Sequence, residues 1–234
     1  MDCGAEAGKR RHINKEDPRP QPEETMKLYD STLAPNPRRV RIFLAEKGVE
    51  VEKVEVDIVS GQNLEADYLA VNPRGLLPTL ELDDGTRIDE TVAICRYLEE
   101  TCPDPPLLGT DAIGKAQIES WQRHIEMDGM FHMADVFRNG APQFKGRSVP
   151  GTNNTDTIPA LIERGTAGVA RFYALLENRL GESEHVGGPE FSIADISAVC
   201  AVDFGGWVKL GIPETCTNTR RWYERVSSRP SMSA

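Results

Sequence analysis

The spacing of hydrophobic and polar positions changes along this chain, from short alternating runs in the first half to long helical repeats in the second. Residues 26–29 and 51–57 have the length of short strands. Between them, residues 37–47 place apolar side chains at helical spacing, and Gly48 follows as a helix stop. This first stretch therefore predicts a strand, a helix and a second strand.

The same alternation continues to about residue 103. A short helix is predicted at 64–70, where Asn72-Pro73 ends helical geometry. An Asp-Asp-Gly turn then separates two short strands, at 79–82 and 87–88, and a helix starts at Glu90. The predicted order from residue 26 is strand, helix, strand, helix, strand, strand, helix.

Strand signals largely vanish after this point, and the pattern predicts a small α/β domain joined by a proline-rich linker to an all-helical one. The domain is expected at 26–103, the linker at 104–110 and the helical domain at 111–234. Predicted helices cover 111–138, 158–180 and 220–226, and another begins at Ser192, which can form a reciprocal cap with Asp195 while Phe191 packs on Ile196. The irregular stretch 139–157 is expected to be either disordered or a functional loop.

Composition narrows the class of protein. Residues 1–25 are charged and proline-rich without an apolar run, so we expect a flexible extension outside the core. The net charge of -10 argues against a nucleic-acid partner, and no apolar run is long enough to span a membrane. The five cysteines lack metal-ligand spacing, which predicts reduced thiols in a cytoplasmic protein.

Four segments together carry a family resemblance: NPRGLLPTL, DETVAICRYLEE, FSIADISAV and RRWYERVSSRPS. In this order the chain from about Met26 onward resembles the glutathione S-transferase superfamily, and within it the bacterial theta-like and nu-like cytosolic types. The resemblance implies an N-terminal thioredoxin-like domain, a C-terminal helical bundle and a cis-proline. It also implies a homodimer, with the glutathione site near the subunit boundary and no metal cofactor.

The resemblance assigns the tripeptide's binding residues. A cis bond before Pro78 would turn the Leu77 backbone toward the cysteine amide of glutathione, which would then pair like an added strand. Thr91 would bind the γ-glutamyl carboxylate at a helix N-terminus, and Glu90 would receive the ammonium group. The alternatives are a proline tolerated at a strand edge and residues that only cap a helix.

The glycine end of glutathione needs another donor. Asn63 occupies the position at which theta-like members place a histidine, and Gln62 lies beside it. A solvated helix cap is an equally good interpretation of Asn63. Leu76 stands where some relatives carry a lysine, so one charged contact is missing.

Lowering the pKa of a thiol from about 8.5 by about two units requires about 2.7 kcal/mol of preferential thiolate stabilisation. Serine-type members supply a hydroxyl at the position of Ala34, which has none. Asn36 matches an asparagine of nu-like members and is the first candidate for thiolate stabilisation. Ser31 is the second, although Asn36 between two prolines is also an ordinary turn residue.

Charged and sulfur-containing side chains near these positions leave further alternatives. Arg38, Arg39 and Arg41 could steer an anion, but a solvated helix face is the commoner interpretation. His124, Asp128 and His132 lie at i, i+4 and i+8, a spacing compatible with a metal, yet we expect a polar lining of the domain cleft or dimer face. The apolar residues among them read as packing first and as an adaptable co-substrate pocket second: Met127, Met130, Phe131 and Met133.

The sequence thus predicts a glutathione transferase that activates the thiol of bound glutathione for attack on a small hydrophobic electrophile. A glutathione-dependent disulfide reductase or peroxidase is one alternative. A non-catalytic glutathione-binding or protein-interaction module is the other, because both tolerate Ala34.

Overall fold

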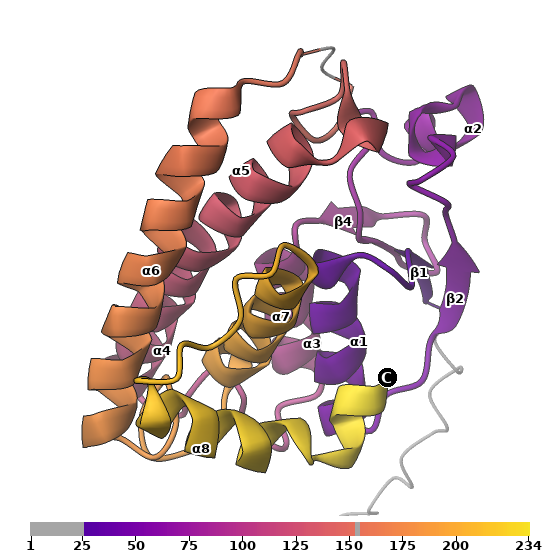
Figure 1. Cartoon of the computed structure of the whole chain (residues 1–234). Coiled ribbons are helices and arrows are strands. Elements are labelled where there is room, and N and C mark those ends of the chain that lie inside the picture. The colour runs from indigo at the N-terminus through magenta and orange to yellow at the C-terminus, as the bar shows by residue number, and fades with distance from the viewer. Residues whose placement is uncertain (1–25, 153–154) are drawn as a thin grey trace, which may run out of the picture.

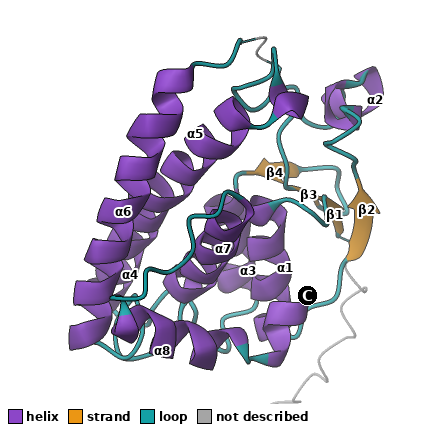
Figure 2. Cartoon of the chain, in the orientation of Figure 1, coloured by secondary structure: helices purple, strands orange, loops and turns teal. Residues whose placement is uncertain are grey.

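The computed structural model describes residues 26–152 and 155–234, so the predicted extension 1–25 lies outside the described residues. A small mixed sheet lies on one side of the molecule and a larger group of helices on the other (Figure 1). The four strands all lie before residue 90, and every regular element after α3 (Thr91–Thr101) in the described part is helical (Figure 2). The predicted division into an α/β part and an all-helical part is therefore confirmed, whereas its boundaries stay predictions.

The sheet places its strands in the order β2 (Glu52–Glu55), β1 (Lys27–Asp30), β3 (Thr79–Glu81) and β4 (Arg87–Asp89). β1 runs parallel to β2 and antiparallel to β3, with Leu28 opposite Leu80. The parallel pair requires a crossover, which α1 (Pro35–Lys47) supplies, while β3 and β4 form the predicted hairpin. The predicted helix at 64–70 is shorter than expected, because a 3₁₀ turn, Gln62–Leu64, precedes α2 (Ala66–Leu69).

The helical part consists of α4 (Ala112–His124), α5 (Phe131–Gly140), α6 (Pro159–Glu182), α7 (Ile193–Trp207) and α8 (Thr217–Ser227). The single helix predicted at 111–138 is interrupted by a π-helical segment, Ile125–Met130. This wider segment places Gly129 against Phe172 of α6, where a Cβ atom would lie 2.9 Å from the ring. Helical spacing along this segment could not reveal the contact, because Phe172 lies on another helix.

The centre of the helical part is α7, which is apolar and buried on nearly all sides. Its N-terminus carries the predicted capping box between Ser192 and Asp195. The buried Asp195 carboxylate also accepts hydrogen bonds from Val186 N at 3.0 Å and from Trp222 Nε1 at 2.8 Å. One carboxylate therefore joins α7, α8 and the segment between α6 and α7.

The linker between the two parts is fixed by Lys47 at the end of α1. Its ammonium donates to the carbonyls of Pro103, at 3.2 Å, and Pro105, at 2.6 Å, and pairs with Glu99 at 2.6 Å. The Glu99 carboxylate in turn accepts from Leu107 N at 3.1 Å. These contacts attach the linker to both α1 and α3.

We predict that Asp195→Ala lowers the free energy of unfolding by about 3 kcal/mol, since each orphaned buried donor costs about 1 to 3 kcal/mol. Urea unfolding measures the change. Asp111→Ala is the matched control, because Asp111 caps α4 through Gly114 N at 2.7 Å on the surface and its loss should cost about 1 kcal/mol. Equal losses in the two variants would contradict the role given to Asp195.

Candidate functional site

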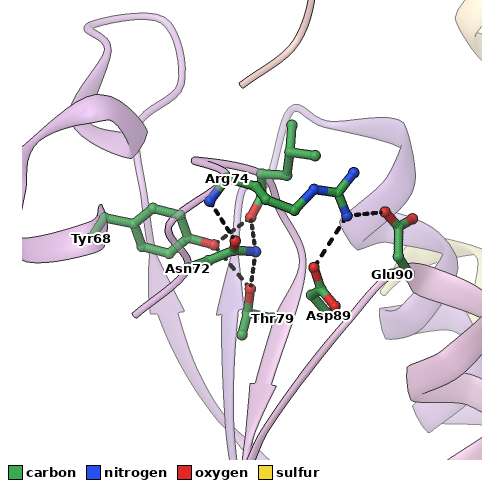
Figure 3. Close-up of polar contacts among 7 residues, drawn as sticks. Tyr68, Asn72, Arg74, Thr79, Asp89 and Glu90 are labelled. Atoms are coloured by element: carbon green, nitrogen blue, oxygen red, sulfur yellow. Dashed lines mark hydrogen bonds and ion pairs between the residues drawn. The ribbon is translucent and has the colours of Figure 1, made fainter. Parts of the chain in front are cut away.

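The turn before β3 contains the peptide bond between Leu77 and Pro78, which is cis as predicted. A cluster of buried polar side chains, Tyr68, Asn72 and Thr79, holds this turn (Figure 3). Tyr68 Oη donates to the Leu76 carbonyl at 2.6 Å and lies 3.1 Å from Thr79 Oγ1. Because burial raises the pKa of Tyr68 to about 12, its hydroxyl stays protonated and remains a donor at neutral pH.

The main chain of Leu77 is left available by this arrangement. Neither its N–H nor its carbonyl pairs with any residue that the structure describes, although Leu77 is only half-exposed. An unpaired donor and acceptor at the start of a strand can pair with an extended peptide. Leu77 and Pro78 therefore keep their predicted place as peptide-binding residues.

Glu90 and Thr91 lie at the start of α3, beside this turn. Glu90 has a positive φ of 69°, a conformation that an L-residue with a side chain rarely adopts and that costs about 1 to 3 kcal/mol. Its carboxylate accepts from Arg74 Nη1 at 2.6 Å, and Asp89 approaches the same nitrogen at 3.2 Å (Figure 3). Arg74, which the sequence analysis did not identify, already donates a hydrogen bond to the Glu90 carboxylate. This is the carboxylate predicted to receive an ammonium group.

Thr91 is buried, and its Oγ1 donates to the Asn36 carbonyl at 3.4 Å. This long bond brings the start of α3 next to the start of α1. Two of the predicted site segments, far apart in the sequence, therefore lie side by side.

The side-chain amide of Asn36 has a defined orientation. Its Oδ1 accepts from Arg39 Nη1 at 3.1 Å. A guanidinium can only donate, so the amide oxygen must face Arg39 and the NH₂ group must face away from it. Asn36 itself is exposed, and its Nδ2 has no partner among the described residues.

Arg39 is buried, and its other donors reach outside its own helix. Nε donates to Ser197 Oγ on α7 at 2.9 Å, and Nη2 donates to Glu126 Oε1 in the π-helical segment at 2.6 Å. Arg38 and Arg41 also have carboxylate partners, Asp203 at 2.5 Å and Asp30 at 2.6 Å. The interpretation of a solvated arginine face is wrong, because these side chains are matched by carboxylates and two of them are buried.

The second thiolate candidate, Ser31, is buried at the end of β1, and its carbonyl accepts from Ala34 N at 2.9 Å. Thr32 turns toward β2 instead, since its N–H and hydroxyl both donate to the Glu55 carboxylate. Ser31 thus lies deeper in the protein than Asn36, which is exposed and does not turn toward β2 as Thr32 does.

Gln62 and Asn63 lie in the 3₁₀ turn before α2. Gln62 Oε1 accepts from Asp57 N at 2.8 Å, and Asn63 Nδ2 donates to Gly75 O at 2.8 Å. The Asn63 oxygen is buried without a partner among the described atoms. Both side chains hold local backbone; the Gln62 amide retains both of its N–H donors beyond these bonds, and the Asn63 amide retains one.

The stretch after α5, for which we expected either disorder or function, is described except for residues 153–154 and contacts the N-terminal part at two places. A Cβ at Gly151 would lie 2.5 Å from the Arg74 carbonyl, and Arg147 Nη1 lies 3.2 Å from the position of a Cβ at Gly61. Figure 1 shows this stretch beside the segment that leads into α2. It thus packs on both loops that carry predicted binding residues.

A row of aromatic rings, which sequence reasoning did not identify, runs from the C-terminal end of α7 to this stretch. Phe137 contacts Phe144, Phe204 and Trp207, with centroid separations of 5.1, 5.5 and 5.9 Å. Trp207 is 49% exposed. The rings pack edge-to-face or tilted, and Phe144 and Phe204 are buried, so an aromatic ligand would meet the row at Phe137 and Trp207.

His124 and Asp128 lie 3.3 Å apart, but His132 packs over Gly168 of α6. The π-helical segment between them breaks the i, i+4, i+8 spacing, and the described residues contain no group of three or more His, Cys, Asp or Glu that could hold a metal. Met130 and Met133 are core residues, whereas Met127 and Phe131 are exposed. The expected packing role therefore holds for two of the four.

An open groove of about 700 Å³ lies between α1, α7 and α8, and it includes Arg38 and Trp207 in its lining. None of the predicted glutathione-binding residues lines it.

No helix in the described part is both long and apolar enough to cross a bilayer.

Family models match both parts of the chain: "Glutathione S-transferase, N-terminal domain" over residues 34–101 and "Glutathione S-transferase, C-terminal domain" over residues 149–230. Glutathione S-transferase 2 of Saccharomyces cerevisiae is 32% identical over 212 residues, which cover 90% of this chain and 89% of that protein.

Solved structures agree with these matches. A glutathione S-transferase domain-containing protein of Marinobacter aquaeolei VT8 is 33% identical with a TM-score of 0.82, over 88% of this chain and 99% of that one. A class Gtt2 glutathione S-transferase of Vibrio parahaemolyticus is 34% identical with a TM-score of 0.76, over 89% of this chain and 96% of that one. The chain therefore belongs to the glutathione S-transferase family of enzymes.

Proposed function

We propose that this enzyme binds glutathione along the turn before β3 and activates its thiol for attack on a small hydrophobic electrophile. The observation that carries the proposal is the unpaired main chain of Leu77 before β3, together with the contact that brings Asn36 to Thr91 at the starts of α1 and α3. A tripeptide backbone would pair with Leu77, and its γ-glutamyl carboxylate would meet the N-terminus of α3. The Glu90 carboxylate would accept from the ammonium group while it keeps the hydrogen bond from its present partner, Arg74.

In this proposal the Nδ2 group of Asn36 stabilises the thiolate. Arg39 fixes the amide so that its N–H bonds face away from the guanidinium. A preorganised donor of this kind lowers the free energy of the thiolate relative to the thiol. Gln62 and Asn63 are proposed for the glycine end, and the aromatic row, Phe137, Phe144, Phe204 and Trp207, is proposed to hold the electrophile. The homodimer and the cytoplasmic location stay predictions.

The protein's own buried thiols are poor alternatives as the nucleophile. Burial raises the pKa of Cys95 to about 12 and that of Cys200 to about 11. Both are therefore neutral thiols at pH 8, whereas a thiolate is the reactive form. Cys102 is half-buried.

Iodoacetamide at pH 8 should alkylate Cys102 in the folded protein and leave Cys95 and Cys200 unmodified until urea is added. Mass spectrometry of peptides after timed quenching measures the site-specific rates. If Cys95 reacted as fast as Cys102 without urea, Cys95 would not be protected by burial. A thiol of the protein would then have to be considered as the nucleophile.

Calorimetry with glutathione tests the proposed function directly, and we expect saturable binding to a single class of site. Conjugation of 1-chloro-2,4-dinitrobenzene should follow, read from the ultraviolet absorbance of the thioether. An enzyme that binds glutathione but turns over only hydroxyethyl disulfide would be the disulfide reductase considered above. No binding of glutathione would overturn the whole proposal.

Asn36→Ala should raise the pKa of the bound thiol by about 1 to 2 units, because a hydrogen bond to a charged group contributes about 1.5 to 3 kcal/mol and one unit is about 1.4 kcal/mol. The pH profile of kcat/KM would move to higher pH, since the thiolate would form later.

Asn36→Asp provides a matched comparison. The aspartate keeps an oxygen for Arg39 but places negative charge near the sulfur, so its shift should exceed that of the alanine variant. Profiles identical to wild type in both variants would remove Asn36 from the mechanism.

A further inference from the structure

Arg138 on α5 carries a half-buried positive charge without a protein acceptor in the described part of the chain. Its Nε is buried and unpartnered, and its guanidinium carbon lies 4.5 Å from the centre of the Phe144 ring. Desolvation, together with the charge of Arg147, lowers the pKa of Arg138 to about 10. A cation in this position is costly unless an anion accompanies it.

The rest of the chain makes this unusual. Acidic residues outnumber basic ones by 37 to 27, and carboxylates are used readily as arginine partners nearby. Arg164 on α6 pairs with Asp135 at 2.8 Å, one turn before Arg138 on the same helix. Arg138 thus has no carboxylate partner among the described residues, although the protein is rich in carboxylates.

A second cation lies on the same ring. Arg147 places its guanidinium carbon 5.8 Å from the Phe144 centroid, and it donates to the carbonyls of Gln143, at 3.3 Å, and Val59, at 3.5 Å. Arg147 thereby connects the loop after α5 to the segment before α2. Two guanidinium groups without a carboxylate therefore flank one aromatic ring beside the proposed glutathione-binding loops.

The aromatic row places this charge next to the proposed electrophile surface. Phe137 immediately precedes Arg138 on α5. Its ring contacts the rings of Phe144, Phe204 and Trp207. The salt bridge from Arg38 to Asp203 holds this end of α7 beside the first turn of α1, where Asn36 lies. The row therefore extends from the end of α7 that lies beside the first turn of α1 to Phe144, over which the Arg138 guanidinium lies.

We propose that Arg138 binds a carboxylate carried by the second substrate, so that the preferred electrophiles are aromatic acids. Arg147 adds a second positive charge at the same subsite. This inference rests on the proposed function and adds the substrate class. A guanidinium recognises a carboxylate through paired N–H donors, which a neutral group of the same shape does not satisfy equally well.

The test reaction is substitution on a chlorinated ring. The glutathione sulfur forms a bond to the carbon that carries chlorine, the carbon–chlorine bond breaks, and chloride leaves with the bonding electrons. The thiol proton goes to solvent when the thiolate forms. No oxidant or reductant is consumed.

The experiment compares 4-chloro-3-nitrobenzoate with 4-chloro-3-nitrobenzamide, which differ in charge but little in shape, each corrected for its uncatalysed rate with glutathione. In Arg138→Gln we expect the ratio of kcat/KM for the acid to that for the amide to fall about 10-fold or more. Arg171→Gln is the matched control, because it removes an exposed arginine from α6 and should leave the ratio unchanged.

Calorimetry with the two S-aryl glutathione products gives a readout without turnover. The carboxylate product should lose about 10-fold more affinity than the carboxamide product in Arg138→Gln. An unchanged ratio in both measurements would overturn the inference. Equal weakening of both products, with a raised KM for glutathione, would also overturn it, because the anion would then be the glycyl carboxylate. If wild type bound neither glutathione nor its products, the proposed function would fail first and the inference with it.

Discussion

The structure depends most on the burial of Arg39. A guanidinium cannot release its proton at any ordinary pH, so a buried arginine is tolerated only where acceptors surround it. Here Ser197 and Glu126 provide them from two different segments of the helical part, while Arg39 belongs to α1. These bonds attach α1 to the helical part, and the Nη1 group of Arg39 sets which side of the Asn36 amide is presented to a ligand.

Both parts of the molecule border the candidate site. The sheet supplies the turn at Leu77, α3 supplies its N-terminus, and the loop after α5 lies over both neighbouring segments through Arg147 and Gly151. Lys47 fastens the linker to α1 and α3 as well. Ligand contacts proposed from opposite parts thus share one rigid framework, which favours preorganised binding over closure of one part on the other.

The sequence predicted those features whose causes are local. Periodicity located most of the helices, the Ser192 cap followed from residues three apart, and the segment around Pro78 could be recognised from its own letters. Features produced by contacts between distant segments were missed. The π-helical segment packs Gly129 on Phe172 of α6, the burial of Arg39 depends on α7, and Arg74 reaches Glu90 only because the turn folds back on α3. Spacing along one helix contains none of this information.

At Glu90, the left-handed backbone sets the requirements of stability against those of function. Glycine would adopt that conformation without steric cost, so a population selected only for foldability would drift toward glycine at this position. Retaining glutamate keeps a carboxylate at the mouth of α3 at the expense of thermodynamic stability. At position 90, the residue that would fold at the least cost and the residue that would serve the proposed site are therefore different.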